Sequence, residues 1–202
     1  AFLFGGRRPT VIPLVNQAKD WTHAVFMGSA AGSETTAANI GAVGVVRRDP
    51  MAMLPFFGYN AADYLLHWLT MPLRTDANKL PKVFFVNWFR KDDKGFMWNG
   101  FGDNARVLKW IFERIDGKAD ARDTAIGYLP KPEAIDMTGY ADKNRDEACL
   151  KATMEALLSV DKEGWKKEIA AVAESYEKFS GRIPFALKAK LAEIQKALDA
   201  QK

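Results

Sequence analysis

The chain has 202 residues, of which 48% are hydrophobic and 27% are charged. This composition is typical of a folded globular protein and excludes wholesale disorder. No apolar run reaches the roughly 20 residues that cross a bilayer, so we expect no membrane partner. The single cysteine, Cys149, excludes an internal disulfide and favours a reducing, cytoplasmic setting.

The charge and the first residues add two weaker indications. A net charge of +4 fits a polyanionic ligand, and a small nucleotide explains it as well as a nucleic acid does. The first residues have neither an initiator methionine nor the layout of a signal peptide. We therefore expect a chain that begins within a domain.

The pattern of residues 1–129 predicts a mixed α/β fold. Short apolar runs predict four strands, at Thr10–Val15, Trp21–Met27, Lys82–Phe89 and Thr124–Leu129. Two further segments predict helices, Ala61–Met71 after Asn60 as N-cap and Ala105–Ile115 after Asp103 or Asn104 as cap.

The composition changes near residue 130, and the last part of the chain is rich in Ala, Lys, Glu and Leu. Apolar residues recur at helical spacing from Trp165 to Phe179 and from Leu187 to Leu198. We expect these two helices to pack on the α/β part, because a single apolar stripe is far more often a core contact than a cofactor site.

The segment from Ser29 to Asp49 fits neither a helix nor a strand. It is rich in Ala, Gly, Ser and Thr and has no bulky residue before Ile40. A segment that buries so little surface should be mobile. Long loops of small residues are either flexible connectors or functional lids, and composition alone leaves both open.

Two groups of residues could bind a nucleotide. In Gly5-Gly6-Arg7-Arg8 the glycines permit a tight turn and the guanidinium groups suit phosphate, although exposed arginines more often form surface ion pairs. Between Trp88 and Phe101, five aromatic residues surround a polar turn and could sandwich a flat heterocycle. A helix beginning near Asn104 would offer unpaired N–H groups to a carbonyl. A core cluster remains the alternative, because buried aromatic residues are usually structural.

Several long motifs resemble one family in their order along the chain: GGRRP, HAVFMGSA, GSETTAA, RRDPMAMLPFFGYN, KLPKVFFVNWFRKD and GFGDNARVLKWIFERIDGKA. They look like the C-terminal part of GTP-dependent phosphoenolpyruvate carboxykinase. The resemblance implies a gluconeogenic enzyme that converts oxaloacetate and GTP to phosphoenolpyruvate, carbon dioxide and GDP. It also implies Mn²⁺ at the active site and a second divalent ion, Mg²⁺, with the nucleotide.

The resemblance assigns a role to each matching residue. Arg7 matches an arginine that contacts the nucleotide phosphates. The aromatic pocket around guanine is matched by Trp88, Phe89, Phe96 and Phe101, and the segment that contacts the base continues through Gly102, Asp103 and Asn104. The stretch Ser33–Asp49 matches a mobile lid, in which Ser33, Glu34 and Ala38 fall. Residues 1–129 then form part of a nucleotide-binding domain, with its guanine pocket at 87–104, and residues 130–202 form the helical region of that domain.

In the family, the phosphate-binding loop and the Mn²⁺ ligands lie upstream of the matching part. The resemblance therefore implies that this chain needs the rest of a monomeric enzyme as its partner and has no turnover alone. Two other interpretations stay open. Basic charge with clustered aromatics would also suit a module that binds single-stranded nucleic acid. A structural lobe without any ligand is the third.

Overall fold

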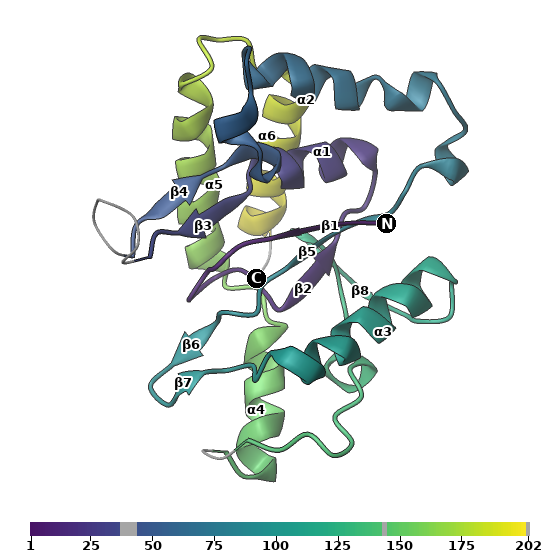
Figure 1. Cartoon of the computed structure of the whole chain (residues 1–202), viewed down its shortest axis with the longest axis vertical. Coiled ribbons are helices and arrows are strands. Elements are labelled where there is room, and N and C mark those ends of the chain that lie inside the picture. The colour runs from purple at the N-terminus through teal and green to yellow at the C-terminus, as the bar shows by residue number, and fades with distance from the viewer. Residues whose placement is uncertain (37–43, 143–144, 201–202) are drawn as a thin grey trace.

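The computed structural model describes residues 1–36, 44–142 and 145–200 and has the mixed α/β fold that the sequence predicts. Its centre is a five-stranded sheet (Figure 1), in the order β1 (Phe2–Gly5), β5 (Val83–Val86), β2 (Val15–Gln17), β9 (Gly127–Leu129) and β8 (Arg122–Thr124). Strand β1 runs parallel to β5, and the other neighbours are antiparallel.

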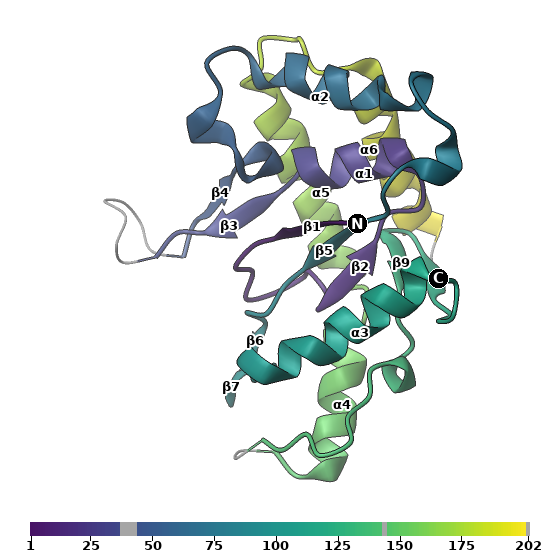
Figure 2. The same ribbon diagram turned by 45° about the vertical axis from the view of Figure 1, so that its right-hand side comes forward.

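Helices cover both faces of the sheet (Figures 1 and 2). One face carries α1 (Trp21–Ser29), α2 (Ala61–Leu69), α5 (Lys162–Glu177) and α6 (Phe185–Ala200), and the other carries α3 (Asn104–Ile115) and α4 (Glu147–Leu157). Each face has its own apolar core. Val25, Leu65, Val172 and Leu198 belong to the first, and Phe84, Trp110, Met154 and Leu157 to the second.

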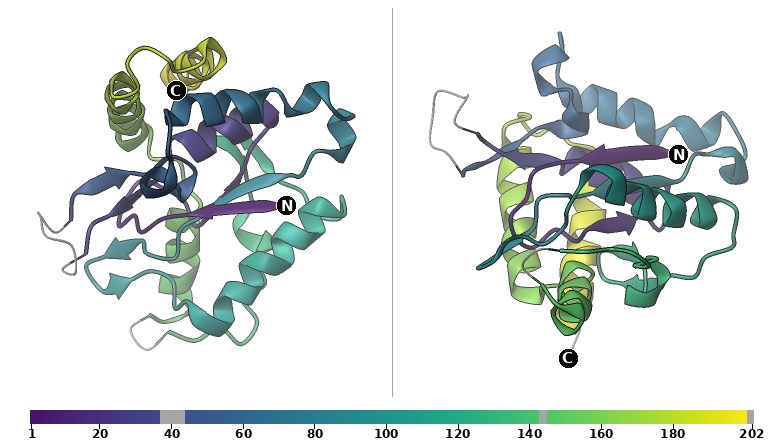
Figure 3. Two further views of the ribbon diagram at one scale, coloured as in Figure 1. Left: turned by 45° about the horizontal axis from the view of Figure 1, so that its top comes forward. Right: turned by 60° about the horizontal axis from the view of Figure 1, so that its bottom comes forward.

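Two small hairpins project from one side of the molecule (Figure 3). One pairs β3 (Gly32–Glu34) with β4 (Val46–Arg48), and the other pairs β6 (Lys91–Asp92) with β7 (Gly95–Phe96). The first leaves the sheet region after α1, and the second follows β5 and leads into α3. Segments far apart in the sequence thereby reach the same side of the domain.

Several predicted elements are confirmed. Strand β5 lies within Lys82–Phe89, and all four of its residues are buried. Helix α2 begins after Asn60, whose Oδ1 accepts a hydrogen bond from Ala62 N at 2.9 Å. Helices α3, α5 and α6 also form where the apolar spacing places them.

The strand predicted at Trp21–Met27 is wrong, because these residues form helix α1. A short apolar run cannot distinguish a buried strand from a helix that is buried nearly all round, and residues 23–29 are all buried. The local signal that decides is Asp20, whose Oδ1 accepts from His23 N at 2.7 Å as an N-cap.

Two other predicted strands are only partly correct. Of Thr10–Val15, only Val15 is in a strand, and the preceding turn contains Val11 with φ of +67°. The segment Thr124–Leu129 is the bend of a hairpin, because β8 ends at Thr124 and β9 begins at Gly127. The sequence does not predict strand β1, the β6–β7 hairpin or helix α4. The expectation that Ser29–Asp49 contains no strand is wrong, because β3 and β4 pair within it through backbone hydrogen bonds that need no bulky side chains.

No helix in the described part of the chain is long and apolar enough to cross a membrane.

The β8–β9 bend depends on a glycine. Gly127 has φ of +126°, and a Cβ there would lie 2.5 Å from the backbone oxygen of Gln17 on the neighbouring strand. Gly127→Ala should therefore lower the free energy of unfolding by about 2 kcal/mol in urea titrations. Gly58→Ala is the matched control, because a Cβ there meets nothing within 4 Å. Equal effects of the two substitutions would contradict this account of the bend.

Candidate functional site

The glycine–arginine turn after β1 lies against the β3–β4 hairpin. A Cβ on Gly6 would overlap the backbone oxygen of Gly32, so only glycine lets the two backbones approach this closely. The side chain of Arg7 is exposed, whereas Arg8 is buried. The turn thus presents one guanidinium group to solvent and directs the next one inward.

Three hydrogen bonds join Arg7 to strand β3. The backbone N of Arg7 donates to Ser33 Oγ at 3.0 Å, and Glu34 N donates to the Arg7 carbonyl at 2.8 Å. Arg7 Nη2 also donates to the carbonyl of Glu34 at 3.3 Å. The structure therefore brings together three of the predicted site residues. Ala38 lies outside the described residues.

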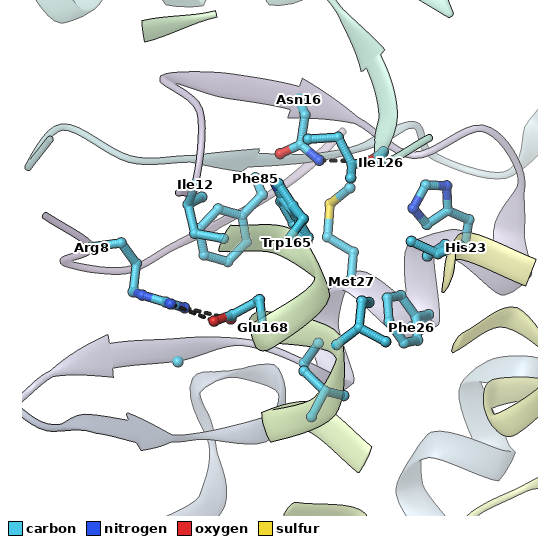
Figure 4. A pocket seen from close by; sticks show the side chains of 15 residues that line it. Arg8, Ile12, Asn16, His23, Phe26, Met27, Phe85, Ile126, Trp165 and Glu168 are labelled. Carbon is cyan, nitrogen blue, oxygen red and sulfur yellow. Dashed lines mark hydrogen bonds and ion pairs between the residues drawn. The ribbon is translucent and has the colours of Figure 1, made fainter. Parts of the chain in front are cut away.

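Next to Arg7 in the chain, Arg8 belongs to a buried ion cluster, and Figure 4 shows its ion pair with Glu168. Arg8 Nη1 and Nη2 donate to the two carboxylate oxygens of Glu168 at 2.7 and 2.6 Å, and Arg48 Nη1 donates to Glu168 Oε1 at 2.6 Å. Burial raises the pKa of Glu168, but the hydrogen bonds and charges of the two arginines outweigh it and lower the pKa to about 2. Glu168 is therefore ionised at neutral pH.

Asn87 links the arginine turn to the aromatic segment. Its Nδ2 donates to the carbonyls of Arg8 and Ile12 at 2.8 and 2.9 Å. Its Oδ1 accepts from the backbone N of Arg8 and of Phe89, each at 3.2 Å. This amide is fully buried, and both its oxygen and its nitrogen are bonded. Sequence analysis missed this role and that of Glu168, because an isolated polar residue does not reveal a partner distant in the chain.

The aromatic residues of the predicted guanine pocket lie in three places: Phe89 with Phe96, Trp88 against the core, and Phe101 on the surface. Phe89 and Phe96 meet edge to face, with ring centroids 6.1 Å apart, and half of Phe96 is exposed. Lys91 Nζ lies 4.8 Å from the centroid of the Phe96 ring. Trp88, in contrast, is partly buried and packs against the core shared by the sheet, α3 and α4.

Phe101 is the most exposed aromatic side chain among the described residues, at 95%. Its backbone has φ of +48°, a left-handed conformation that is uncommon for a residue with a side chain, and Gly100 before it has φ of +76°. Such strain persists only where the surroundings fix it and is concentrated at functional sites. Within the described part of the chain, Phe101 pairs with no other aromatic ring.

The start of α3 lies immediately after Phe101. Asn104 Oδ1 accepts from Trp98 Nε1 at 2.8 Å, which orients the side-chain amide so that its NH₂ group faces away from Trp98. Asp103 Oδ1 is held by Arg106 Nε at 2.8 Å, and Gly102 is exposed. Helix α3 continues directly from a 3-10 turn, Phe101–Asp103, in which Asp103 N donates to the Gly100 carbonyl and Asn104 N to the Phe101 carbonyl. The N–H groups of Phe101 and Gly102, which begin this turn, have no partner among the described residues and can donate to a ligand.

Other titratable residues have structural partners. His23 is buried in α1, where burial lowers its pKa to about 4, and its Nδ1 accepts from Lys19 N at 3.2 Å. Asp63 is bound by Arg182 Nη2 at 2.8 Å. In the described ranges, no three His, Cys, Asp or Glu side chains gather in a way that could hold a metal ion.

Comparison with known proteins gives one consistent result. Residues 1–197 match the family described as the phosphoenolpyruvate carboxykinase C-terminal P-loop domain. The chain is 51% identical over 199 residues to a phosphoenolpyruvate carboxykinase [GTP] of Arthrobacter sp. (strain FB24), covering 98% of this chain and 31% of that protein. It is 52% identical over 198 residues to a protein of the same name from Treponema pallidum (strain Nichols), covering 96% and 31%. The chain thus spans about a third of the length of these relatives.

The ion cluster predicts how stability depends on pH. The pKa of Glu168 is lower in the folded state than its ordinary value, so its contribution is complete above about pH 4.5 and is lost as the pH falls toward 2. Between pH 6 and pH 3 this carboxylate should account for a loss of roughly 2 kcal/mol in unfolding free energy, measured in urea.

The protonation midpoint can be observed directly. The carboxyl carbon of Glu168, followed by NMR in the folded chain, should titrate near pH 2. The exposed Glu177 on the same helix is the control. A Glu168 midpoint at or above that of Glu177 would show that the arginines do not stabilise the carboxylate.

Proposed function

Because the chain belongs to the GTP-dependent phosphoenolpyruvate carboxykinase family, we propose that it is the nucleotide-binding C-terminal domain of such an enzyme. The full-length protein would convert oxaloacetate and GTP to phosphoenolpyruvate, carbon dioxide and GDP. The observation that best supports this role is Phe101, an almost fully exposed ring on a strained backbone at the start of the 3-10 turn that leads into α3. That arrangement suits a flat base, whose face stacks on the ring while the helix start donates to its carbonyl.

The guanine site in this proposal has three parts. The rings of Phe89, Phe96 and Phe101 supply its apolar faces, and the NH₂ group of Asn104 supplies a donor for the base. Gly102 and Asp103, which lie between Phe101 and Asn104, contribute backbone groups to the site. The partly buried Trp88 would support the proposed guanine site from its core side, because its ring packs against the apolar core.

Arg7 would meet the phosphates. Its guanidinium group is exposed, and among the described residues it makes one hydrogen bond, from Nη2 to the Glu34 carbonyl at 3.3 Å. The remaining donors can pair with phosphate oxygens and neutralise the charge that develops during phosphoryl transfer. Asn87 is bonded to the backbone of Phe89 and of Arg8, the residue after Arg7. The proposed phosphate and base subsites therefore share one buried support.

Ser33 and Glu34 would fix one end of the lid, which we assign to residues 33–49. The described ends of this segment are β3 and β4, and β3 is bonded to Arg7. A lid attached at the phosphate arginine could cover the enolate formed by decarboxylation. Excluding water there would prevent its protonation to pyruvate.

In the proposed enzyme, Mn²⁺ and Mg²⁺ are held by residues upstream of the part of the family that this chain resembles. Among the described residues, no three acidic, histidine or cysteine side chains gather in a way that could hold a metal ion. The substrates are small molecules, and the enzyme would be a cytoplasmic monomer.

Two substitutions in the full-length protein should separate the subsites. Arg7→Ala should lower kcat by about a thousandfold, because a phosphate-neutralising arginine acts mainly in the transition state. Phe101→Ala should raise the KM for GTP about tenfold with a smaller effect on kcat, because it removes stacking on the base. Steady-state assays of phosphoenolpyruvate formation would measure both. Near-normal kcat in Arg7→Ala, or an unchanged KM in Phe101→Ala, would remove that residue from the proposed site.

A further inference from the structure

Helix α5 contributes one side chain to the region beneath Arg7. Glu168 is 160 residues from Arg8 in the chain, yet its carboxylate is bonded to both terminal nitrogens of that guanidinium group. Arg48, at the end of β4, donates to the same carboxylate and also to the Ala30 carbonyl at 3.1 Å. One acidic group therefore holds both the arginine turn and the β3–β4 hairpin.

The two segments that Glu168 holds meet at Arg7. Arg8 is the next residue after Arg7, so fixing its guanidinium group fixes the turn. Arg48 pairs with Gly32 in the hairpin, and Ser33 and Glu34, which follow Gly32, are bonded to Arg7. The position of Arg7 is thus determined from both sides by contacts that converge on one carboxylate.

The charge balance makes this carboxylate difficult to replace. The side chains of Arg8, Arg48 and Glu168 are only 6%, 12% and 10% exposed. Without the negative charge, two poorly hydrated guanidinium groups would face each other, and their repulsion would be screened weakly. The turn and the hairpin would then be driven apart.

We infer that Glu168 is a positioning residue that holds Arg7 and the base of the β3–β4 hairpin in place relative to each other. Its consequence for catalysis rests on the proposed function, in which Arg7 meets phosphate. Glu168 itself is buried against Arg8 and Arg48 and acts only through them.

A double-mutant cycle in the full-length protein tests this inference. Glu168→Gln should lower kcat by about 10- to 100-fold, because a catalytic group displaced by about 1 Å loses that much. In the Arg7→Ala background the same substitution should change kcat less than about threefold, because the group it positions is gone. Glu168→Asp keeps the charge with a shorter reach and should give an intermediate kcat.

Val172→Ala is the matched control. Val172 lies one turn further along α5 and is buried in the apolar core, and its side chain has no polar atom that could bond to the ion cluster. It should lower Tm while kcat stays within about twofold of the wild type. An equal fall of kcat in Val172→Ala and Glu168→Gln would show that general loss of stability explains the effect, and full additivity with Arg7→Ala would overturn the inference.

A second readout on the 202-residue chain does not depend on the enzymatic activity. The Glu34 amide is bonded to the Arg7 carbonyl, so its hydrogen exchange reports the contact between turn and hairpin. Exchange should be about tenfold faster in Glu168→Asp than in Val172→Ala. If wild-type protein forms no phosphoenolpyruvate but this exchange difference is found, the proposed function fails and the positioning role stands. If the wild type is active and the exchange rates are equal, the positioning role fails.

Discussion

Glu168 is stable in its buried site only while both of its guanidinium partners remain, and both partners come from segments next to Arg7, the Arg7–Arg8 turn and the β3–β4 hairpin. Removing one member of a buried ion pair typically costs about 3–5 kcal/mol, because the remaining charge is left without compensation. The cluster therefore ties helix α5 to the Arg7–Arg8 turn and to the β3–β4 hairpin more firmly than surface pairs could. The C-terminal helices are thus part of the support of the candidate site as well as part of the apolar core.

Asn87 also ties distant segments of the chain together, but through hydrogen bonds between neutral groups. It joins the arginine turn to Phe89, at the point where β5 ends and the aromatic segment begins. The proposed phosphate and base subsites, on different segments, are consequently held by buried groups. The residues that we propose to contact a nucleotide, Arg7 and Phe101, are both exposed.

Much of this fold follows from local signals in the sequence. Strand β5 is continuous apolar sequence, and α2 has its cap in Asn60, so both are predictable. Helix α1 is not predictable in this way. It is buried nearly all round, and its apolar run therefore resembles that of a buried strand. For the candidate site, the residue types in the sequence indicate Arg7 and the aromatic residues between Trp88 and Phe101. The roles of Asn87 and Glu168 could not be predicted, because their partners are 79 and 160 residues away.

We propose that this domain carries a site selective for guanine nucleotides, and calorimetric titration of the chain with GDP is the experiment that tests this selectivity. ADP and a short single-stranded RNA are the comparison ligands, each at two salt concentrations. We expect GDP to bind at least about tenfold more tightly than ADP, because guanine, unlike adenine, has a carbonyl that can accept from the N–H groups at the start of the Phe101–Asp103 turn. Salt-sensitive binding of RNA without a preference for GDP would contradict it and favour a nucleic-acid module. Binding of none of the three would contradict the claim that the site forms within this chain.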